Sequence, residues 1–246
     1  MKNVNKNSPN KNKMFNKLVI VLLIIVVLLG TFITFDFITF NHIKKGTKVK
    51  KEKVNNIFNI KVKGNDNFVF LGDSLTEYYS LKEYYENLPV INSGVGGNTT
   101  NDILDDLEDR VYKYNPSKVF LLIGINDMKK GRDEEYILNN IVKIVNEIKK
   151  NRPHAKIYVE SLYPINNSDN EKINHESLVN RTNEKIDNVN RMLKEKYDNT
   201  DVTYIDINSK MKENGILKLD YTVEGVHITP LGYINVTRLL LPYLAE

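Results

Sequence analysis

The chain has 246 residues and no cysteine. This absence excludes disulfide bonds, thiolate metal sites and an anchor built on a lipid-modified cysteine. The sequence also lacks a cluster of metal-binding side chains at ligand spacing, so we expect neither a metal ion nor a cofactor. Any attachment to a membrane must therefore be made by the peptide itself.

Basic residues are scarce outside the N-terminal region. The formal net charge is +4, yet residues 1–53 carry eleven lysines against only Asp36 and Glu52, which leaves the remainder at about −5. Tracking a phosphate backbone needs a basic surface, so we expect no nucleic-acid partner. The glycine-rich stretch 94–99 precedes a helical pattern, but no lysine follows it as in a P-loop, which disfavours nucleotide binding.

One long apolar run lies near the N-terminus. Residues 18–35, LVIVLLIIVVLLGTFITF, carry no charge and follow a tail whose charged residues are all lysines. At about 1.5 Å per residue a helix over this run reaches about 27 Å, close to the hydrocarbon thickness of a bilayer. We predict a cytoplasmic basic tail (1–17), a single transmembrane anchor (18–40), a stalk (41–66) and an extracytoplasmic domain (67–246).

Two other interpretations of the apolar run are less favoured. A cleaved secretory signal has an apolar stretch of about 7–15 residues and a small-x-small cleavage site, and neither fits. A buried helix of a soluble domain is seldom apolar on every face between lysine clusters. Lysines flank both ends of the run, so the orientation depends on the first tail, which is short and purely basic and favours a cytoplasmic N-terminus.

Short apolar runs separated by helical patterns make up the rest of the chain. The runs have the length and branched character of buried parallel strands, and they cover residues 68–71, 89–91, 119–123, 157–159 and 202–205. Helical stripes are predicted over residues 103–111, 137–148, 178–193 and 233–244, with a weaker one in 76–88. The alternation predicts a three-layer α/β/α domain with a flavodoxin-like parallel sheet of about five strands.

Chemically useful residues follow four of these strands. Ser74 follows the first, Gly97 the second and Asn126 the third, and His227 comes in the loop after the fifth. In a doubly wound sheet ligands bind outside the carboxyl ends of the strands, so we expect these residues to converge.

Ser74 is the candidate nucleophile, and a serine hydroxyl needs a base to remove its proton during attack. His227 is the candidate base because His42, His154 and His175 occupy less suitable positions: the membrane edge, a site before a strand and a long polar loop.

The base needs a partner that holds its tautomer and stabilises the imidazolium. Glu224, three residues upstream of His227, can share a turn with it. Asp220 is a neighbouring alternative, and a Ser-His dyad assisted by a backbone carbonyl is a third.

Four segments resemble the sequence blocks of the SGNH hydrolases, also called the GDSL lipase/esterase family. They are Gly72-Asp73-Ser74-Leu75, Gly96-Gly97-Asn98-Thr99 after Val90-Ile91-Asn92, Gly124-Ile125-Asn126-Asp127, and Gly225-Val226-His227 with Gly232-Tyr233 beyond. The resemblance implies an oxyanion hole made by the backbone N–H groups of Ser74 and Gly97 and the side-chain amide of Asn126. One departure is Glu224, where the family has aspartate.

We therefore expect a serine esterase anchored in the cell membrane of a bacterium, acting on small-molecule, glycan or lipid esters outside it. Short loops between the motifs leave no obvious lid or acyl tunnel, which favours small acyl groups such as acetyl on surface glycans. The alternatives are an O-acyltransferase to a glycan hydroxyl, a lysophospholipase, and a catalytically silent surface-binding module in which Glu224 marks a decayed site.

Overall fold

The computed structural model describes residues 66–246. The predicted tail, the predicted anchor and nearly all of the predicted stalk lie outside these residues and remain predictions. Within the described part, none of the helices combines the length and the apolar character that crossing a membrane requires.

Five parallel strands form one sheet in the order β2-β1-β3-β4-β5. They are β1 (Phe68–Gly72), β2 (Val90–Gly94), β3 (Lys118–Leu122), β4 (Lys156–Glu160) and β5 (Thr203–Ile205). Each strand falls on one of the apolar runs, with bounds shifted by a few residues. This strand order is that of flavodoxin-like folds, so the predicted fold class is confirmed for the domain.

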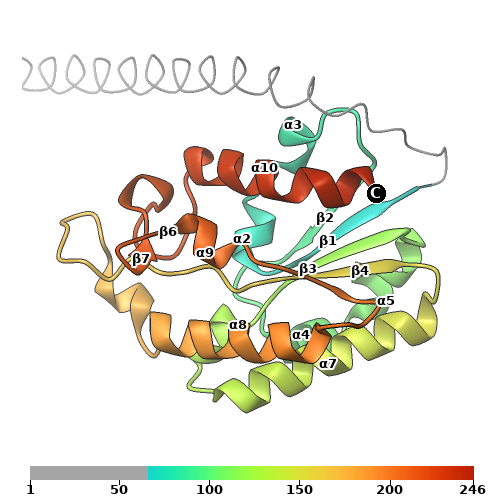
Figure 1. Ribbon diagram of the computed structural model, residues 1–246, viewed down its shortest axis with the longest axis horizontal. Helices are drawn as coiled ribbons and strands as arrows, with labels where there is room; N and C mark the ends of the chain where they lie inside the picture. Colours follow the sequence, from blue (N-terminus) through green and yellow to red (C-terminus); the bar gives the residue numbers. More distant parts are fainter. Residues whose placement is uncertain (1–65) are drawn as a thin grey trace, which may run out of the picture. The chain divides into compact units, whose positions relative to one another are not determined.

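Helices cover both faces of the sheet, as Figure 1 shows. One face carries α4 (Thr100–Leu104), α5 (Leu107–Arg110), α7 (Glu134–Asn151) and α8 (Asn183–Tyr197), and the other carries α3 (Leu81–Tyr84) and α10 (Pro230–Ala245). Asp133 caps α7 by accepting a hydrogen bond from the backbone N–H of Tyr136 at 2.7 Å, which satisfies one of the free donors of the first turn. The result is the predicted three-layer arrangement.

Three helical predictions were wrong in their extent. The helix expected over residues 103–111 is divided into α4 and α5 at Asp105 and Asp106, and aspartate favours helix ends over helix interiors. The helix expected from residue 178 starts at Asn183, because Thr182 acts as its N-cap and accepts from the backbone N–H of Lys185. The weak helix of 76–88 is two short ones, α2 (Ser74–Glu77) and α3.

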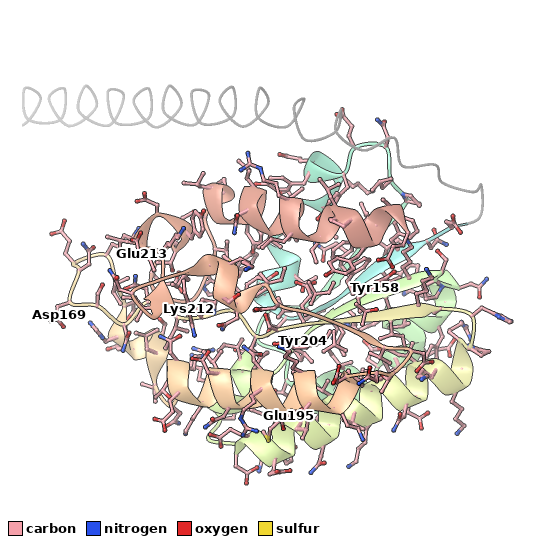
Figure 2. All side chains as sticks on the ribbon, viewed as in Figure 1. Tyr158, Asp169, Glu195, Tyr204, Lys212 and Glu213 are labelled. Carbon is pink, nitrogen blue, oxygen red and sulfur yellow. The ribbon has the colours of Figure 1, made fainter. Side chains whose placement is uncertain are left out.

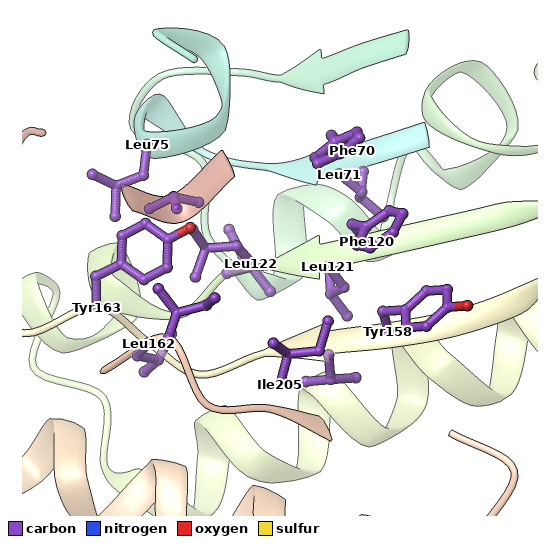
Figure 3. Close-up of a cluster of buried hydrophobic side chains, with 14 of the residues drawn as sticks. Phe70, Leu71, Leu75, Phe120, Leu121, Leu122, Tyr158, Leu162, Tyr163 and Ile205 are labelled. Atoms are coloured by element: carbon purple, nitrogen blue, oxygen red, sulfur yellow. The ribbon is translucent and has the colours of Figure 1, made fainter. Parts of the chain in front are cut away.

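A ladder of aromatic rings crosses the centre of the sheet. Phe70, Phe120 and Tyr158 occupy paired positions on β1, β3 and β4 (Figure 3). Their ring centroids are 4.7 Å and 4.6 Å apart, and all three side chains are buried. Burial of large rings contributes strongly to folding, and a one-residue slip of a strand would turn its ring to the opposite face. The ladder thereby specifies the register that brings the strand ends level.

Two irregular segments extend from the carboxyl-end side of the sheet. One is the segment of residues 161–182 between β4 and α8, whose only regular element is the 3-10 turn η2 (His175–Leu178). The other contains α9 (Asn208–Met211) and a hairpin of β6 (Lys212–Glu213) and β7 (Ile216–Leu217). Asp169 and Glu213 lie in these two segments at one end of the molecule (Figure 2). The expectation of uniformly short loops was wrong at residues 161–182.

Candidate active site

Ser74 begins α2 directly after β1. Asp73, the N-cap residue, accepts a hydrogen bond from the backbone N–H of Leu75 at 2.9 Å. A Cβ on Gly72 would lie 2.1 Å from Thr76 Oγ1 and 2.5 Å from the carbonyl oxygen of Leu122. Glycine is therefore required where the chain turns sharply from strand to helix, and this turn places the serine hydroxyl at the edge of the sheet.

Ser74, His227 and Glu224 form one continuous hydrogen-bonded chain. Ser74 Oγ lies 3.0 Å from His227 Nε2, and His227 Nδ1 lies 2.7 Å from Glu224 Oε1. The serine and the histidine are 153 positions apart in sequence, so only the fold brings them together. The His227 side chain is 35% exposed, which leaves the ring accessible from solvent.

A tight turn over residues 222–227 holds the acid and the base. Thr222 Oγ1 accepts from the backbone N–H of Gly225 at 2.8 Å and donates to the carbonyl oxygen of His227 at 3.0 Å. Gly225 has a φ of 117°, a region that favours glycine, and a Cβ there would lie 2.9 Å from the carbonyl oxygen of Asn166. The turn needs glycine for both its backbone angle and its space.

The irregular segment of residues 161–182 braces this turn from outside. The backbone N–H of Asn166 donates to the carbonyl oxygen of Gly225 at 2.9 Å, and that of Asn174 donates to the carbonyl oxygen of Glu224 at 2.8 Å. These bonds satisfy backbone groups on both segments. The long polar loop around His175 therefore positions the carboxylate beside the histidine, a role that the sequence did not indicate.

Glu224 is held as a carboxylate. Burial acts to raise its pKa, but the hydrogen bonds from the ring and backbone of His227, together with the charge of that ring, hold the pKa below its usual value. Asp220 is exposed and lies in the turn η3 (Leu219–Tyr221), where its backbone carbonyl accepts from Thr229 Oγ1 at 2.7 Å. The geometry thus brings Glu224, not Asp220, to the histidine.

Gly97 lies in the loop after β2. Its φ of 78° is left-handed, and an added Cβ would meet nothing within 4 Å, so the requirement for glycine there is conformational. The loop is tied to β1, because the backbone N–H of Val95 donates to the carbonyl oxygen of Gly72 at 3.1 Å. A Cβ on the adjacent Gly96 would lie 3.9 Å from Ser74 Cβ, which places this loop directly against the serine.

Asn126 bridges the second and third motifs from the first turn of α6 (Ile125–Lys129). Its Nδ2 donates to the carbonyl oxygen of Asn98 at 3.0 Å, and its Oδ1 accepts from Arg181 Nη2 at 2.8 Å. The side chain is 8% exposed. An amide held at both ends in this way presents its remaining N–H in a fixed direction.

The two aspartates of the motifs, Asp73 and Asp127, are buried beside the site. Asp127 accepts from the backbone N–H and the hydroxyl of Thr100 at 3.0 Å and 2.6 Å, and Asn140 donates to the same hydroxyl at 2.9 Å. Asp73 is completely buried, and its Oδ2 has no hydrogen-bond partner within the described part of the chain. Burial raises the pKa of Asp73 to about 7.

Two buried arginines are functional neighbours that the sequence analysis missed. Arg110 donates to the carbonyl oxygen of Gly72 at 2.6 Å and to Asn98 Oδ1 at 2.5 Å, joining the ends of the first two motifs. Arg181 contacts Asn126 from the polar segment before α8. Neither residue lies in a motif or on a periodic stripe that would have distinguished it from a surface arginine.

The tyrosines that follow Ser74 divide into two groups. Tyr78 is 57% exposed, and its ring centroid lies 5.4 Å from that of His227. Tyr79, Tyr84 and Tyr85 are buried between the sheet and α10. Tyr78 therefore lies at the mouth of the site, while its neighbours pack between the layers.

The arrangement has the chemical groups that acyl transfer requires. A hydroxyl faces an imidazole whose other nitrogen faces a carboxylate, a glycine loop lies against the serine, and the Asn126 amide is fixed on the carbonyl oxygen of Asn98 in that loop. Within residues 66–246 no group of three or more histidine, aspartate or glutamate side chains is arranged to hold a metal ion.

The family model described as "GDSL-like Lipase/Acylhydrolase family" matches residues 70–233, which contain all four motifs. The chain belongs to this family. The membership confirms the resemblance to SGNH hydrolases and covers the whole region in which the candidate residues converge.

Two curated proteins are similar in sequence to this chain. Rat platelet-activating factor acetylhydrolase IB subunit alpha2 is 24% identical over 175 residues, which cover 69% of this chain and 72% of the rat protein. The N-acylneuraminate cytidylyltransferase of Streptococcus agalactiae serotype V is 27% identical over 165 residues, covering 65% of this chain and 34% of that protein. The chain thus spans about a third of the length of this second relative.

Solved structures superimpose on most of the chain. A Streptococcus pneumoniae protein described as a platelet activating factor matches with a TM-score of 0.68 and 30% identity, over 83% of this chain and 95% of that one. A variant of the acetyl-xylooligosaccharide esterase Axe2 from Geobacillus matches with a TM-score of 0.59 and 20% identity, over 76% and 97% of the two chains. The second likeness shows a shared fold.

Proposed function

We propose that the chain hydrolyses carboxylic esters through an acyl-enzyme formed on Ser74. The observation that carries the proposal is the hydrogen-bonded chain from Ser74 Oγ through the His227 ring to Glu224 Oε1. A serine is a poor nucleophile without an adjacent base, and a carboxylate on the far nitrogen keeps that base in the right tautomer. Glu224 would fill the role that aspartate has in the family.

The first half of the reaction transfers the acyl group to the enzyme. Ser74 Oγ forms a bond to the ester carbonyl carbon while His227 Nε2 takes the hydroxyl proton, and the carbonyl electron pair moves to the oxygen. Collapse of this tetrahedral intermediate breaks the bond to the alkoxy oxygen. His227 returns the proton to the departing alcohol.

The second half releases the acid. Water attacks the acyl carbon as His227 takes one of its protons, and a second tetrahedral intermediate forms. The bond to Ser74 Oγ then breaks, His227 returns the proton to that oxygen, and the free enzyme is regenerated.

The oxyanion of each intermediate would be held by three donors: the backbone N–H groups of Ser74 and Gly97 and Asn126 Nδ2. Removing one such donor in comparable enzymes lowers kcat roughly 100- to 1000-fold. Two features support this assignment. Gly97 has a positive φ and no side chain in the loop whose preceding residue, Gly96, lies against Ser74, and the amide of Asn126 is fixed from both ends.

We infer a small acyl group, such as acetyl, on a glycan or another small alcohol. Two relatives, the rat acetylhydrolase and the Axe2 esterase, are named for acetyl esters. The exposed ring of Tyr78 beside His227 offers an apolar face for the alcohol portion or the acyl methyl group. The alternative substrate is a lysophospholipid, which has a long acyl chain. Hydrolysis rates for esters of increasing acyl length would reveal it.

We further propose that the enzyme acts outside the cell membrane, held there by residues 18–40. The uncharged run and its purely basic preceding tail support this orientation. External protease should remove the domain from intact cells that produce the full-length chain. A domain that survives external protease but is digested after lysis would reverse the proposed orientation.

The test of the hydrolase proposal uses a fluorophosphonate probe, which labels activated serines, together with acetate release from an acetylated oligosaccharide. Wild type should label and release acetate, Ser74→Ala should do neither, and Ser80→Ala should match wild type. Ser80 is an exposed serine six positions away, so it controls for a general effect of removing a hydroxyl. Equal background labelling of wild type and Ser74→Ala would favour a silent binding module. Acetyl transfer to added glycan without acetate release would favour an acyltransferase.

A further inference from the structure

We propose that Arg181 is a positioning residue that orients and polarises the amide of Asn126. The proposal rests on the function inferred above, in which Asn126 donates to the oxyanion. Arg181 itself is separated from the reacting atoms by Asn126, so its effect would be transmitted through that side chain.

Arg181 is buried, and its guanidinium donates hydrogen bonds to three acceptors. Only 7% of the residue is exposed. Its Nε donates to the carbonyl oxygen of Ile125 at 3.0 Å, its Nη2 to Asn126 Oδ1 at 2.8 Å, and its Nη1 to the carbonyl oxygen of Ser177. The guanidinium thus binds both the backbone carbonyl oxygen of Ile125 and the side-chain amide of Asn126.

These contacts determine which way the amide points. A guanidinium can only donate hydrogen bonds, so the atom that faces Arg181 must be the oxygen of the amide. The nitrogen then faces the opposite way, where one of its two hydrogens goes to the carbonyl oxygen of Asn98 at 3.0 Å. The other hydrogen remains for a substrate oxygen. Without Arg181 the amide would lose one of the two contacts that fix its orientation, and the bond to the Asn98 carbonyl oxygen would have to hold it alone.

The charge of Arg181 adds a second effect. Arg181 forms none of the ion pairs found among residues 66–246. Burial lowers the pKa of its guanidinium, and the charges of Asp73 and Glu224 act in the opposite direction. A buried cation without a paired carboxylate is costly. Negative charge developing on a substrate oxygen at the far end of the Asn126 amide would be stabilised by this cation, because linked hydrogen bonds polarise one another.

A purely structural role for Arg181 predicts something different. In that case the arginine only joins residues 177–181 to α6, and its loss would lower stability without a specific effect on the oxyanion. The two roles are separated by asking whether the effect of Arg181 depends on Asn126 being present.

The experiment is a double-mutant cycle on the purified full-length chain, with Arg181→Met, Asn126→Ala and the double variant. Initial rates of acetyl ester hydrolysis are divided by the number of sites that a fluorophosphonate labels at completion, so unfolded molecules do not count. Arg152→Met is the matched control. Arg152 also donates to backbone carbonyl oxygens, but it lies before β4, at the amino ends of the strands and far from the site.

We expect Asn126→Ala to lower kcat per site roughly 100- to 1000-fold. Arg181→Met should lower kcat about ten- to a hundredfold and change KM less than about threefold, because the oxyanion interaction strengthens only in the transition state. In the Asn126→Ala background, Arg181→Met should change kcat less than about twofold, since no donor remains to be positioned. Arg152→Met should change kcat less than about twofold in both backgrounds.

Two results would contradict the role of Asn126 and the role of Arg181 separately. If Asn126→Ala retains most of its activity, the oxyanion role of Asn126 fails and the role of Arg181 fails with it. If Asn126→Ala is severely impaired and Arg181→Met lowers kcat equally in both backgrounds, only the positioning role fails.

Should Arg181→Met not fold, Arg181→Lys replaces it in the same cycle. Lysine keeps the charge but cannot reach three acceptors as a planar fork does. We expect a smaller loss of kcat that again disappears with Asn126→Ala, and a shift of the Asn126 side-chain amide signals in the NMR spectrum. Unchanged amide signals together with an additive rate loss would contradict the proposal.

Discussion

One carboxylate oxygen of Glu224 receives two hydrogen bonds from His227. Oε1 lies 2.7 Å from the ring Nδ1 and 3.2 Å from the backbone nitrogen of the same residue. The longer side chain of glutamate is thus accommodated within the turn, because Gly225 takes a positive φ between the acid and the base.

This geometry predicts a large difference between two neighbouring acids. Glu224→Gln should lower kcat roughly 1000- to 10,000-fold, since an amide at this position favours the wrong histidine tautomer. Asp220→Asn, which removes an exposed carboxylate, should change kcat less than about twofold. Steady-state kinetics on both variants decides between them, and the reverse ranking would assign the role to Asp220. Nearly full activity of both would favour a Ser-His dyad.

Substitutions at Gly97 and Gly215 provide a controlled test of the role of the loop that contains Gly97. Both have a left-handed φ, 78° and 81°, and both have open space where a Cβ would be. Substitution by alanine should cost each about 1–2 kcal/mol of unfolding free energy through backbone strain. Only Gly97→Ala should also lower kcat, by roughly 100-fold if its N–H leaves the oxyanion. Urea unfolding and kinetics measure the two effects, and equal kcat in both variants would contradict the role of Gly97.

Substitutions at Tyr78 and Tyr85 should distinguish a residue that contacts substrate from one that packs in the core. Tyr78→Ala removes a ring that is 57% exposed, so the unfolding free energy should change by less than about 0.5 kcal/mol, while KM for the ester rises severalfold. Tyr85→Ala removes a ring that is 2% exposed and should cost about 3–5 kcal/mol. Thermal unfolding and kinetics on both variants test this. An unchanged KM in Tyr78→Ala would remove Tyr78 from the proposed site.

Buried Asp73 predicts how stability depends on pH. Its pKa is raised from 3.8 to about 7, so between these values the folded chain holds a proton that the unfolded chain has released. The contribution of this group to the unfolding free energy therefore falls as pH rises from about 4 to about 7, then levels off. Asp73→Asn should gain stability relative to wild type over that interval, by up to about 4 kcal/mol. Urea unfolding of both proteins at several pH values checks this prediction. A difference in unfolding free energy that does not change with pH would contradict it.

The sequence was sufficient for the parallel sheet, its two covering layers and the residues in the motifs. Apolar runs of branched residues separated by helical stripes have few alternatives to a parallel sheet covered on both faces, and Ser74, Asn126 and His227 follow the ends of such runs. Helix ends were less predictable. Thr182 could extend a stripe or cap it, and the outcome depended on where the neighbouring segment packs.

The sequence by itself determined the family, the fold and the candidate nucleophile, base and donors, because these depend on local pattern and on spacing within motifs. Only the tertiary structure decided that Glu224 meets His227 and that Arg181 fixes Asn126. The physical reason is that the Arg181 contact joins residues 55 positions apart, and that the turn carrying Glu224 and His227 is held by the backbone of Asn166 and Asn174. Residues 161–177 carry no periodicity, yet their backbone holds the Glu224 turn, and Arg181 just beyond them reaches the amide.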